Sequence, residues 1–241
     1  MDDKILGFVL NTIRYGDSSL IVRIYTLNAG LQSYMVKGVG GKHSGNRIAF
    51  FQPMTFLRFL QSAKPRQGGM AYLKAPEVSY AYQSIPRVMN KSAILMYVDE
   101  LLSQTLTQQE RNDALYSFVS QSLVWLDLVE AGYASFPLYF TLELSRFLGF
   151  YPQCNYTEGA LFDMMEGQFV LVVPPHPYYF EKEHSAVLAK LLNRKVDEMA
   201  EVPLTGLQRN ALLDGIINFM RLHAPVLKGL QSHEILKEVL R

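Results

Sequence analysis

The chain has one cysteine, Cys154, among its 241 residues, and this scarcity limits its chemistry. A single cysteine forms no internal disulfide, and its spacing from His176 and His184 matches no zinc pattern. No apolar run approaches the roughly 18 residues that a membrane-spanning helix needs. The start, MDDKILGFVL, lacks the basic segment and apolar stretch of a secretory signal. We therefore expect a cytoplasmic protein with no membrane partner, no bound metal and no other cofactor.

Catalytic constellations are also lacking. Ser18 and Ser19 do not sit in the strand–turn–helix context of a nucleophile elbow. Asp99 and Glu100 are adjacent on a predicted helix, where neighbouring side chains point apart, so they do not form a paired-carboxylate site. The sequence shows no internal repeat and no low-complexity segment. We expect a protein that binds its partners and is not an enzyme.

Basic and acidic residues are unevenly distributed along the chain, although the net charge is only +1. Residues 1–80 carry ten Lys or Arg and four Asp or Glu, which gives 10 − 4 = +6. The rest carries 13 basic and 18 acidic residues, which gives −5. A basic first third indicates a polyanion as its partner. Ordinary surface charge explains the same count equally well.

Period-2 alternation dominates the first eighty residues and predicts strands. Five apolar runs are separated by turn sequences such as YGD at 15–17 and PRQGG at 65–69. Five short strands in this length fit a small closed barrel, and a five-stranded OB-fold is one solution. The fold class predicted is therefore α+β multidomain, with an N-terminal OB-fold barrel over residues 1–82.

From about residue 87 the apolar period changes to that of amphipathic helices. Helices are predicted through Ile94–Leu102, Phe118–Val129 and 135–148, and a T-x-x-Q capping box at Thr205 begins another. A short last helix follows Ser232. Residues 160–173 predict a β-hairpin that turns at Glu166 and Gly167. The second predicted domain is thus α-helical, over residues 83–241, with one small hairpin.

The stretch VKGVGGKHSG at 36–45 suggests contact with phosphate. It fails as a Walker loop, because Val36 stands where the first glycine belongs and His43 where Ser or Thr belongs. The dinucleotide fingerprint fails as well, because its third glycine is also replaced by His43. What remains is a basic loop between two strands, whose glycines allow its backbone to approach phosphate closely. The candidate DNA-binding residues are Lys37, Lys42, His43, Arg47, Arg14, Arg23, Lys64 and Arg66.

Aromatic rings are the other requirement for binding single strands, because bases stack on them. The candidate platforms are Tyr15, Tyr25, Tyr34 and Tyr72, although a tyrosine in a strand is more often half-buried packing. Near the end of the chain, Arg209, Arg221 and Lys228 are interleaved with apolar residues. This pattern fits an acidic, apolar partner peptide, or simply a helix with a solvated rim.

An ordered set of short motifs resembles the bacterial RecO family. These motifs are GFVL at 7–10, YGDS at 15–18, YT at 25–26, GL at 30–31, KGV at 37–39, FQPM at 51–54 and FLGFYP at 147–152. The family's pattern reads G-x-V-L, Y-G-E-S, T-x-x-x-G, K-G and L-Q-P, followed by L-L-G-Y-x-P in a helical domain. The resemblance covers most of the chain, and the order of the motifs is more specific than any one of them.

The resemblance implies an N-terminal OB-fold, a helical C-terminal domain and a role in DNA repair and recombination. RecO-like proteins bind single- and double-stranded DNA, anneal complementary strands and act with RecR. Together the two proteins help to load RecA onto DNA covered by single-strand-binding protein (SSB), whose C-terminal tail binds the helical domain. By resemblance we expect these partners, and a nucleoid-associated location in the cytoplasm.

The sequence departs from the family pattern at two places. Many members carry a four-cysteine zinc site after the L-L-G-Y-x-P segment, whereas residues 151–173 hold only Cys154. Zinc is therefore predicted to be absent. The family's basic L-K-S near the C-terminus reads Leu230-Gln231-Ser232, so no peptide-binding lysine is carried over to that position.

Three hypotheses remain open from the sequence. The first is a RecO-like recombination mediator with a DNA-binding barrel. The second is a protein–protein adapter, whose helical domain binds partner peptides while the barrel does not grip DNA. The third, an enzyme that binds a nucleotide on its glycine-rich loop, is disfavoured by the failed motif spacing.

Overall fold

The computed structural model describes residues 4–39, 48–63, 69–107, 110–227 and 229–240. The chain divides into two compact units. Unit 1 contains Met1–Gln83 and Leu102–Gln121, and unit 2 contains Ser84–Leu101 and Ser122–Arg241. Residues 102–121 thus fold with the first unit, although the domain ranges expected from the sequence, 1–82 and 83–241, assign them to the second. Those ranges stay a prediction.

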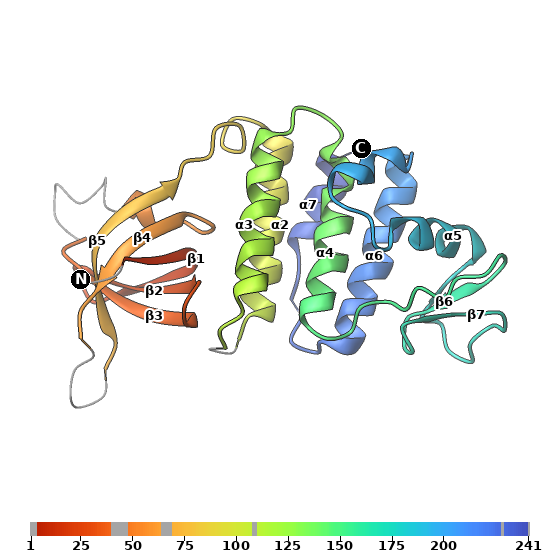
Figure 1. The fold of residues 1–241 in the computed structure, drawn as a ribbon, viewed down its shortest axis with the longest axis horizontal. Helices are drawn as coiled ribbons and strands as arrows, with labels where there is room; N and C mark the ends of the chain where they lie inside the picture. Colours follow the sequence, from red (N-terminus) through yellow and green to blue (C-terminus); the bar gives the residue numbers. More distant parts are fainter. Residues whose placement is uncertain (1–3, 40–47, 64–68, 108–109, 228, 241) are drawn as a thin grey trace. The chain divides into compact units, whose positions relative to one another are not determined.

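Unit 1 is built around a closed five-stranded barrel (Figure 1). The strand order is β1-β2-β3-β5-β4, and β1 pairs with β4 to close it. All neighbours are antiparallel except β3 and β5, which are parallel. This is the OB-fold arrangement, so the predicted fold class is confirmed. The strands are β1 (Ile5–Tyr15), β2 (Ser19–Thr26), β3 (Gly30–Lys37), β4 (Phe56–Gln61) and β5 (Ala71–Tyr80), with the 3-10 helix η1 (Ala49–Phe51) before β4.

Alternate residues of the strands fill the barrel. Leu20, Val22 and Ile24 of β2 point inward and are nearly or fully buried. Tyr34 of β3 meets Phe59 of β4 edge-on inside the same core, with ring centroids 5.0 Å apart. Because side chains alternate between the two faces of a strand, the residues between these inward-pointing ones lie on the outer face of the barrel.

Part of the barrel's exterior is covered by residues 102–121 within unit 1. The Phe8 ring stacks on Tyr25, with centroids 5.4 Å apart, and on Tyr116, with centroids 5.8 Å apart. The Tyr25 hydroxyl donates to the Glu110 carbonyl at 3.4 Å. Gly30, with φ of 60°, lies so close to the same carbonyl that a Cβ there would collide with it. This side of the barrel is therefore covered by other residues of unit 1.

Unit 2 is mainly helical, as predicted. The helices are α2 (Met89–Thr105) and α3 (Asp113–Leu128), each of which contributes residues to both units, and α4 (Phe136–Phe147), α5 (Lys182–Leu191), α6 (Gly206–His223) and α7 (Ser232–Val239), with short 3-10 helices η2 (Tyr133–Ser135) and η3 (Asp197–Glu201). The predicted capping box is present: Thr205 accepts from the Gln208 backbone, and the Gln208 side chain accepts from the Thr205 backbone. The sequence did not predict α5.

A buried lysine fixes the beginning of unit 2. The Lys91 ammonium donates to the Ser84 hydroxyl at 2.7 Å and to the backbone carbonyls of Asp127 and Val129. The Asp127 carboxylate accepts from the backbone N–H groups of Ser84 and Ile85 at 2.8 and 2.9 Å. The Lys91 ammonium thus satisfies carbonyl groups at the C-terminal end of α3, and the Asp127 carboxylate satisfies the backbone N–H groups of residues 84 and 85. Burial lowers the pKa of Lys91, while the nearby Asp127 and Glu130 raise it in part.

A small sheet stands where the family pattern places zinc ligands. It has the order β7-β6-β8, with β6 (Leu161–Asp163), β7 (Gln168–Val170) and β8 (Tyr179–Phe180). The predicted hairpin is thus β6–β7, and β8 adds a strand that the sequence did not predict. Phe162 packs against Phe169 and against Phe219 of α6, with ring centroids 5.1 and 5.6 Å apart. Aromatic packing anchors this sheet to the helices.

Two glycines with similar backbone angles provide a test of the packing around Gly30. Gly30→Ala adds a collision with Glu110 to the cost of a positive φ, whereas Gly16, with φ of 62°, has open space around it. We expect Gly16→Ala to cost about 1 kcal/mol, as for one residue in the left-handed region, and Gly30→Ala to cost clearly more. Thermal or urea denaturation of the two variants measures the difference. Equal losses would contradict the close contact.

Candidate nucleic-acid interface

The pairing register of β1, β2, β3 and β5 arranges the outer face in rows. One row contains Asn11, Arg23 and Ser33, which are paired across β1, β2 and β3. The next row on the same face is two residues further along each strand and crosses all four strands. Its members are Ile13, Ile21, Met35 and Tyr72. A third row contains Tyr15, Ser19 and Lys37.

The middle row is an apolar strip open to solvent. Ile13 is 56% exposed, and Ile21, Met35 and Tyr72 are partly exposed. Arg23 lies on one side of this strip and Lys37 on the other. Since the rows of Arg23 and Lys37 are four residues apart along a strand, they are separated by about 13 Å. Apolar and aromatic surface between two rows with cations suits a chain of bases with phosphates on both sides.

Lys37 and Tyr72 form a cation–π pair across β3 and β5. The Lys37 ammonium lies 4.6 Å from the centroid of the Tyr72 ring. Lys37 is exposed, and the pair lies at the end of β3, just before the glycine-rich segment. An exposed cation beside an aromatic face can contact a phosphate and a stacked base together.

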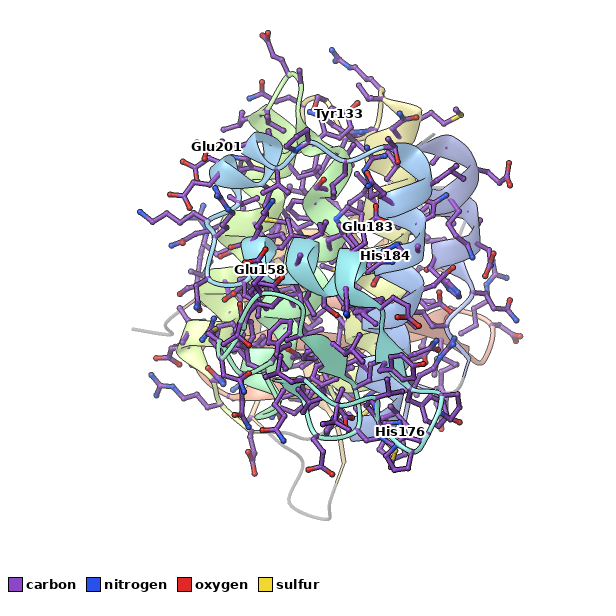
Figure 2. All side chains as sticks on the ribbon, turned by 90° about the vertical axis from the view of Figure 1, so that its right-hand side faces the viewer. Tyr133, Glu158, His176, Glu183, His184 and Glu201 are labelled. Carbon is purple, nitrogen blue, oxygen red and sulfur yellow. The ribbon has the colours of Figure 1, made fainter. Side chains whose placement is uncertain are left out.

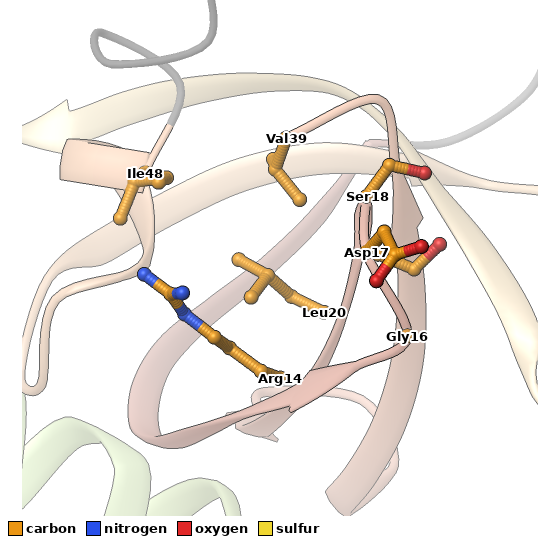
Figure 3. Close-up of a pocket in the computed structure, with 8 residues that line it drawn as sticks. Arg14, Gly16, Asp17, Ser18, Leu20, Val39 and Ile48 are labelled. Carbon is orange, nitrogen blue, oxygen red and sulfur yellow. The ribbon is translucent and has the colours of Figure 1, made fainter. Parts of the chain in front are cut away.

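Arg14 belongs to a different face. It pairs with Leu20, whose side chain points into the barrel, so Arg14 lies at the mouth of the barrel and not on the outer face. There it lines a cavity of about 370 Å³ (Figure 3). Figure 3 shows the guanidinium of Arg14 reaching towards Ile48, with Leu20 between it and Ser18. The remaining lining residues are Gly16, Asp17, Ser19 and Val39. The mouth thus offers one cation and two hydroxyls, with one carboxylate opposite.

Of the predicted DNA-binding residues, the structure describes Arg14, Arg23 and Lys37. Lys42, His43, Arg47, Lys64 and Arg66 lie outside the described residues. The assignment of all eight to DNA therefore stays a prediction. Within the described part, Arg23 and Lys37 are brought to one face, and Arg14 is not.

Two of the four candidate tyrosines are unavailable for stacking. Tyr25 is 2% exposed and packs on Phe8, and Tyr34 is 3% exposed inside the barrel. Burial raises the pKa of the Tyr34 hydroxyl to about 12. Tyr15 is 58% exposed, and Tyr72 lies beside Lys37. The sequence could not separate these pairs, because Tyr25 shares the outer face of β2 with Arg23 and is buried by residues distant in the chain, such as Phe8 and Glu110.

Two other cations of the barrel are already paired. Glu77 of β5 accepts from Lys4 at 2.7 Å and from Arg58 of β4 at 2.9 Å. Hydrogen bonds from Lys4 and Arg58 lower the pKa of the Glu77 carboxyl. This ion triad reduces the local positive charge on that part of the barrel, whereas Arg23 and Lys37 form no ion pair within the part of the chain that the structure describes.

In unit 2, the predicted partner-peptide residues Arg209 and Arg221 of α6 bind backbone carbonyls. Arg209 donates to the carbonyls of Leu240 at 2.6 Å and Leu204 at 3.3 Å. Arg221 donates to the carbonyls of Leu227 at 3.3 Å and Leu230 at 3.4 Å. Lys228 lies outside the described residues. Their role towards a partner stays a prediction.

One group of possible metal ligands occurs among the described residues: Asp214, His233 and Glu234. Lys237 places its ammonium 3.1 Å from Asp214 and 2.9 Å from Glu234, so a cation from the chain itself already pairs with both carboxylates. His176 and His184 do not gather into a site with each other, as Figure 2 shows.

The zinc ligands of the family pattern are replaced by a side-chain bridge. Asn155 accepts from the Phe169 N–H at 2.9 Å and donates to the Phe169 carbonyl at 3.2 Å. The neighbouring Cys154 is exposed and accepts from the Asn193 side-chain amide. One thiol does not make a zinc site, so residues 151–173 do not fit that metal.

A chelator distinguishes a segment 151–173 that is held by zinc from one that is held by hydrogen bonds and aromatic packing. We expect EDTA to leave the melting temperature unchanged, because hydrogen bonds and aromatic packing do not depend on a metal. Asn155→Ala removes two hydrogen bonds and should cost about 1–2 kcal/mol. Cys154→Ala is the matched control and should cost less. A clear drop in melting temperature with EDTA would contradict this assignment.

No helix among the described residues is long and apolar enough to cross a membrane.

Comparison with known proteins covers nearly the whole chain. The family model described as "Recombination protein O N terminal" matches residues 1–82, and that described as "Recombination protein O C terminal" matches residues 87–229. The chain is 34% identical over 241 residues to the DNA repair protein RecO of Flavobacterium psychrophilum, covering 99% of both chains. The corresponding proteins of Phocaeicola vulgatus and Bacteroides fragilis are 32% and 31% identical, again over 99% of both chains.

Proposed function

Because the chain belongs to the RecO family of DNA repair and recombination proteins, we propose that its barrel binds DNA and that it acts as a recombination mediator. In this role it binds single- and double-stranded DNA and anneals complementary strands. With RecR it helps to load RecA onto SSB-covered DNA. The work consists of binding and positioning strands, with no bond made or broken by the protein.

The observation that carries the proposal is the placement of Arg23 and Lys37 on one barrel face. The apolar strip of Ile13, Ile21, Met35 and Tyr72 lies between their rows. Cations attract the phosphates of any strand, while an apolar strip contacts bases only where they are unpaired. The outer face is thus suited to single strands, and the charges alone suffice for a weaker grip on a duplex.

Two further contacts complete the proposal. Arg14 at the barrel mouth is suited to a second stretch of the backbone, since its guanidinium lines an open cavity with the hydroxyls of Ser18 and Ser19. In unit 2, the region of Arg209, Arg221 and Lys228 receives the acidic, apolar C-terminal tail of SSB. Charge-assisted hydrogen bonds to carboxylates and apolar packing supply that contact.

The electrostatic part is tested by a matched pair of double variants. Arg23→Gln with Lys37→Gln should remove two phosphate contacts, which lowers the log–log salt slope for single strands by about 1.4. The control, Lys4→Gln with Arg58→Gln, removes the same charge from cations already paired with Glu77 and should change the slope less. Fluorescence anisotropy with a labelled oligonucleotide at several salt concentrations measures both.

Two results would count against the DNA-binding barrel. A salt slope that both double variants change equally would show that the outer face has no special part. Negligible DNA binding together with strong binding of the SSB tail would instead favour the adapter hypothesis.

The apolar strip is tested separately from the charges. Tyr72→Leu keeps an apolar side chain but removes the ring, so we expect a loss of about 1 kcal/mol or more in binding a single strand and little change for a duplex. Tyr80→Leu, at the other end of β5, is the control for a general effect on the barrel. Equal losses on single strands and duplex would show that the ring does not meet bases.

A further inference from the structure

The last helix, α7, is held at its beginning by a side chain from another helix. Its first residues have no cap from their own side chains. Glu100 of α2 supplies it, accepting from the N–H of Gln231 at 3.0 Å, from the N–H of Ser232 at 2.8 Å and from the Ser232 hydroxyl. Burial raises the pKa of Glu100, but these hydrogen bonds outweigh it and hold the pKa below its ordinary value.

The other end of α7 is held by α6, beside which it packs (Figure 2). Arg209 of α6 donates to the Leu240 carbonyl, and Asp214 of α6 pairs with Lys237. Leu236 and Leu240 face inward and are 1% and 5% exposed, whereas Ile235 is 46% exposed. Two leucines thus supply much of the apolar contact of this helix.

The contact between α7 and α6 leaves polar groups unsatisfied. The Nε of Arg209 is buried and has no hydrogen-bond partner among the described residues. The same holds for Nδ1 of His233, which lies on the buried side of α7. Burying a donor or acceptor without a partner costs its full hydration. The site beneath α7 is therefore not fully matched by the segment that fills it.

A carboxylate would match Arg209 better than the present carbonyls do. Arg209 now gives one N–H to Leu240 and one to Leu204, which leaves Nε without an acceptor. The two oxygens of a carboxylate accept two parallel N–H groups from a guanidinium. A helix as short as α7, with eight residues, is also unstable by itself and depends on its docking contacts.

We propose that α7 is a displaceable segment that competes with an acidic, apolar partner peptide for Arg209 and for the surface beneath Leu236 and Leu240. The proposal rests on the proposed function, in which this region of unit 2 receives such a peptide. The chain's own C-terminal segment then sets how tightly the partner binds. The apparent association constant of the partner is then its intrinsic value multiplied by the fraction of molecules in which α7 is undocked.

The test uses the full chain with α7 undocked by one substitution. Leu236→Asp places a charge on the buried side of α7, and Ile235→Asp, on its exposed side, is the matched control. A second variant, Glu100→Gln, weakens the cap without altering the apolar contact. Two labelled probes are titrated by fluorescence anisotropy: a peptide with the sequence of residues 230–240 and a peptide with the sequence of an SSB C-terminal tail.

Both probes should bind Leu236→Asp about tenfold more tightly than the unaltered chain, with a smaller gain for Glu100→Gln and none for Ile235→Asp. Circular dichroism confirms that each variant stays folded. If the tail peptide binds all four proteins equally, the competition is refuted while the proposed partner contact stands. If the 230–240 peptide binds Leu236→Asp and the tail peptide binds none, it is the proposed partner contact that fails.

Discussion

The alternation of side chains along β2 and β3 is the constraint on which the candidate interface depends. Val22, Ile24 and Tyr34 fill the barrel, and their burial leaves Arg23 and Lys37 no position except the outer face. A slip of one residue would exchange the two faces, burying the cations and exposing the core. The burial that stabilises the barrel therefore also places Arg23 and Lys37 on its outer surface.

The sequence predicts the barrel, the change to helices near residue 87 and the capping box at Thr205, because each is a local pattern with its own period or cap. It does not predict which strands become neighbours. The parallel pairing of β3 with β5 brings Tyr72 to Lys37, and residues 35 positions apart in the chain carry no local sign of that contact. The register of β1 with β2 likewise places Arg14 at the mouth, away from Arg23.

The candidate peptide-binding arginines show another limit of sequence reasoning. A basic residue between apolar neighbours on a helix predicts a charged rim, but Arg209 and Arg221 use their guanidinium groups on carbonyls of the chain itself. The same groups that would recognise a partner thus hold the C-terminal part of unit 2. The small sheet is likewise held by contacts within the chain, since Asn155 and aromatic rings pack in the region where many RecO-like proteins are expected to carry cysteines.

A nuclear magnetic resonance titration with methyl-labelled isoleucine and methionine tests the central claim directly. The methyl groups of Ile13, Ile21 and Met35 lie on the outer face, whereas Ile24 lies inside the barrel and Ile216 inside unit 2. A single-stranded oligonucleotide should shift the first three signals in proportion to saturation and leave the other two nearly unchanged. Saturable binding that leaves Ile13, Ile21 and Met35 unmoved would contradict the account.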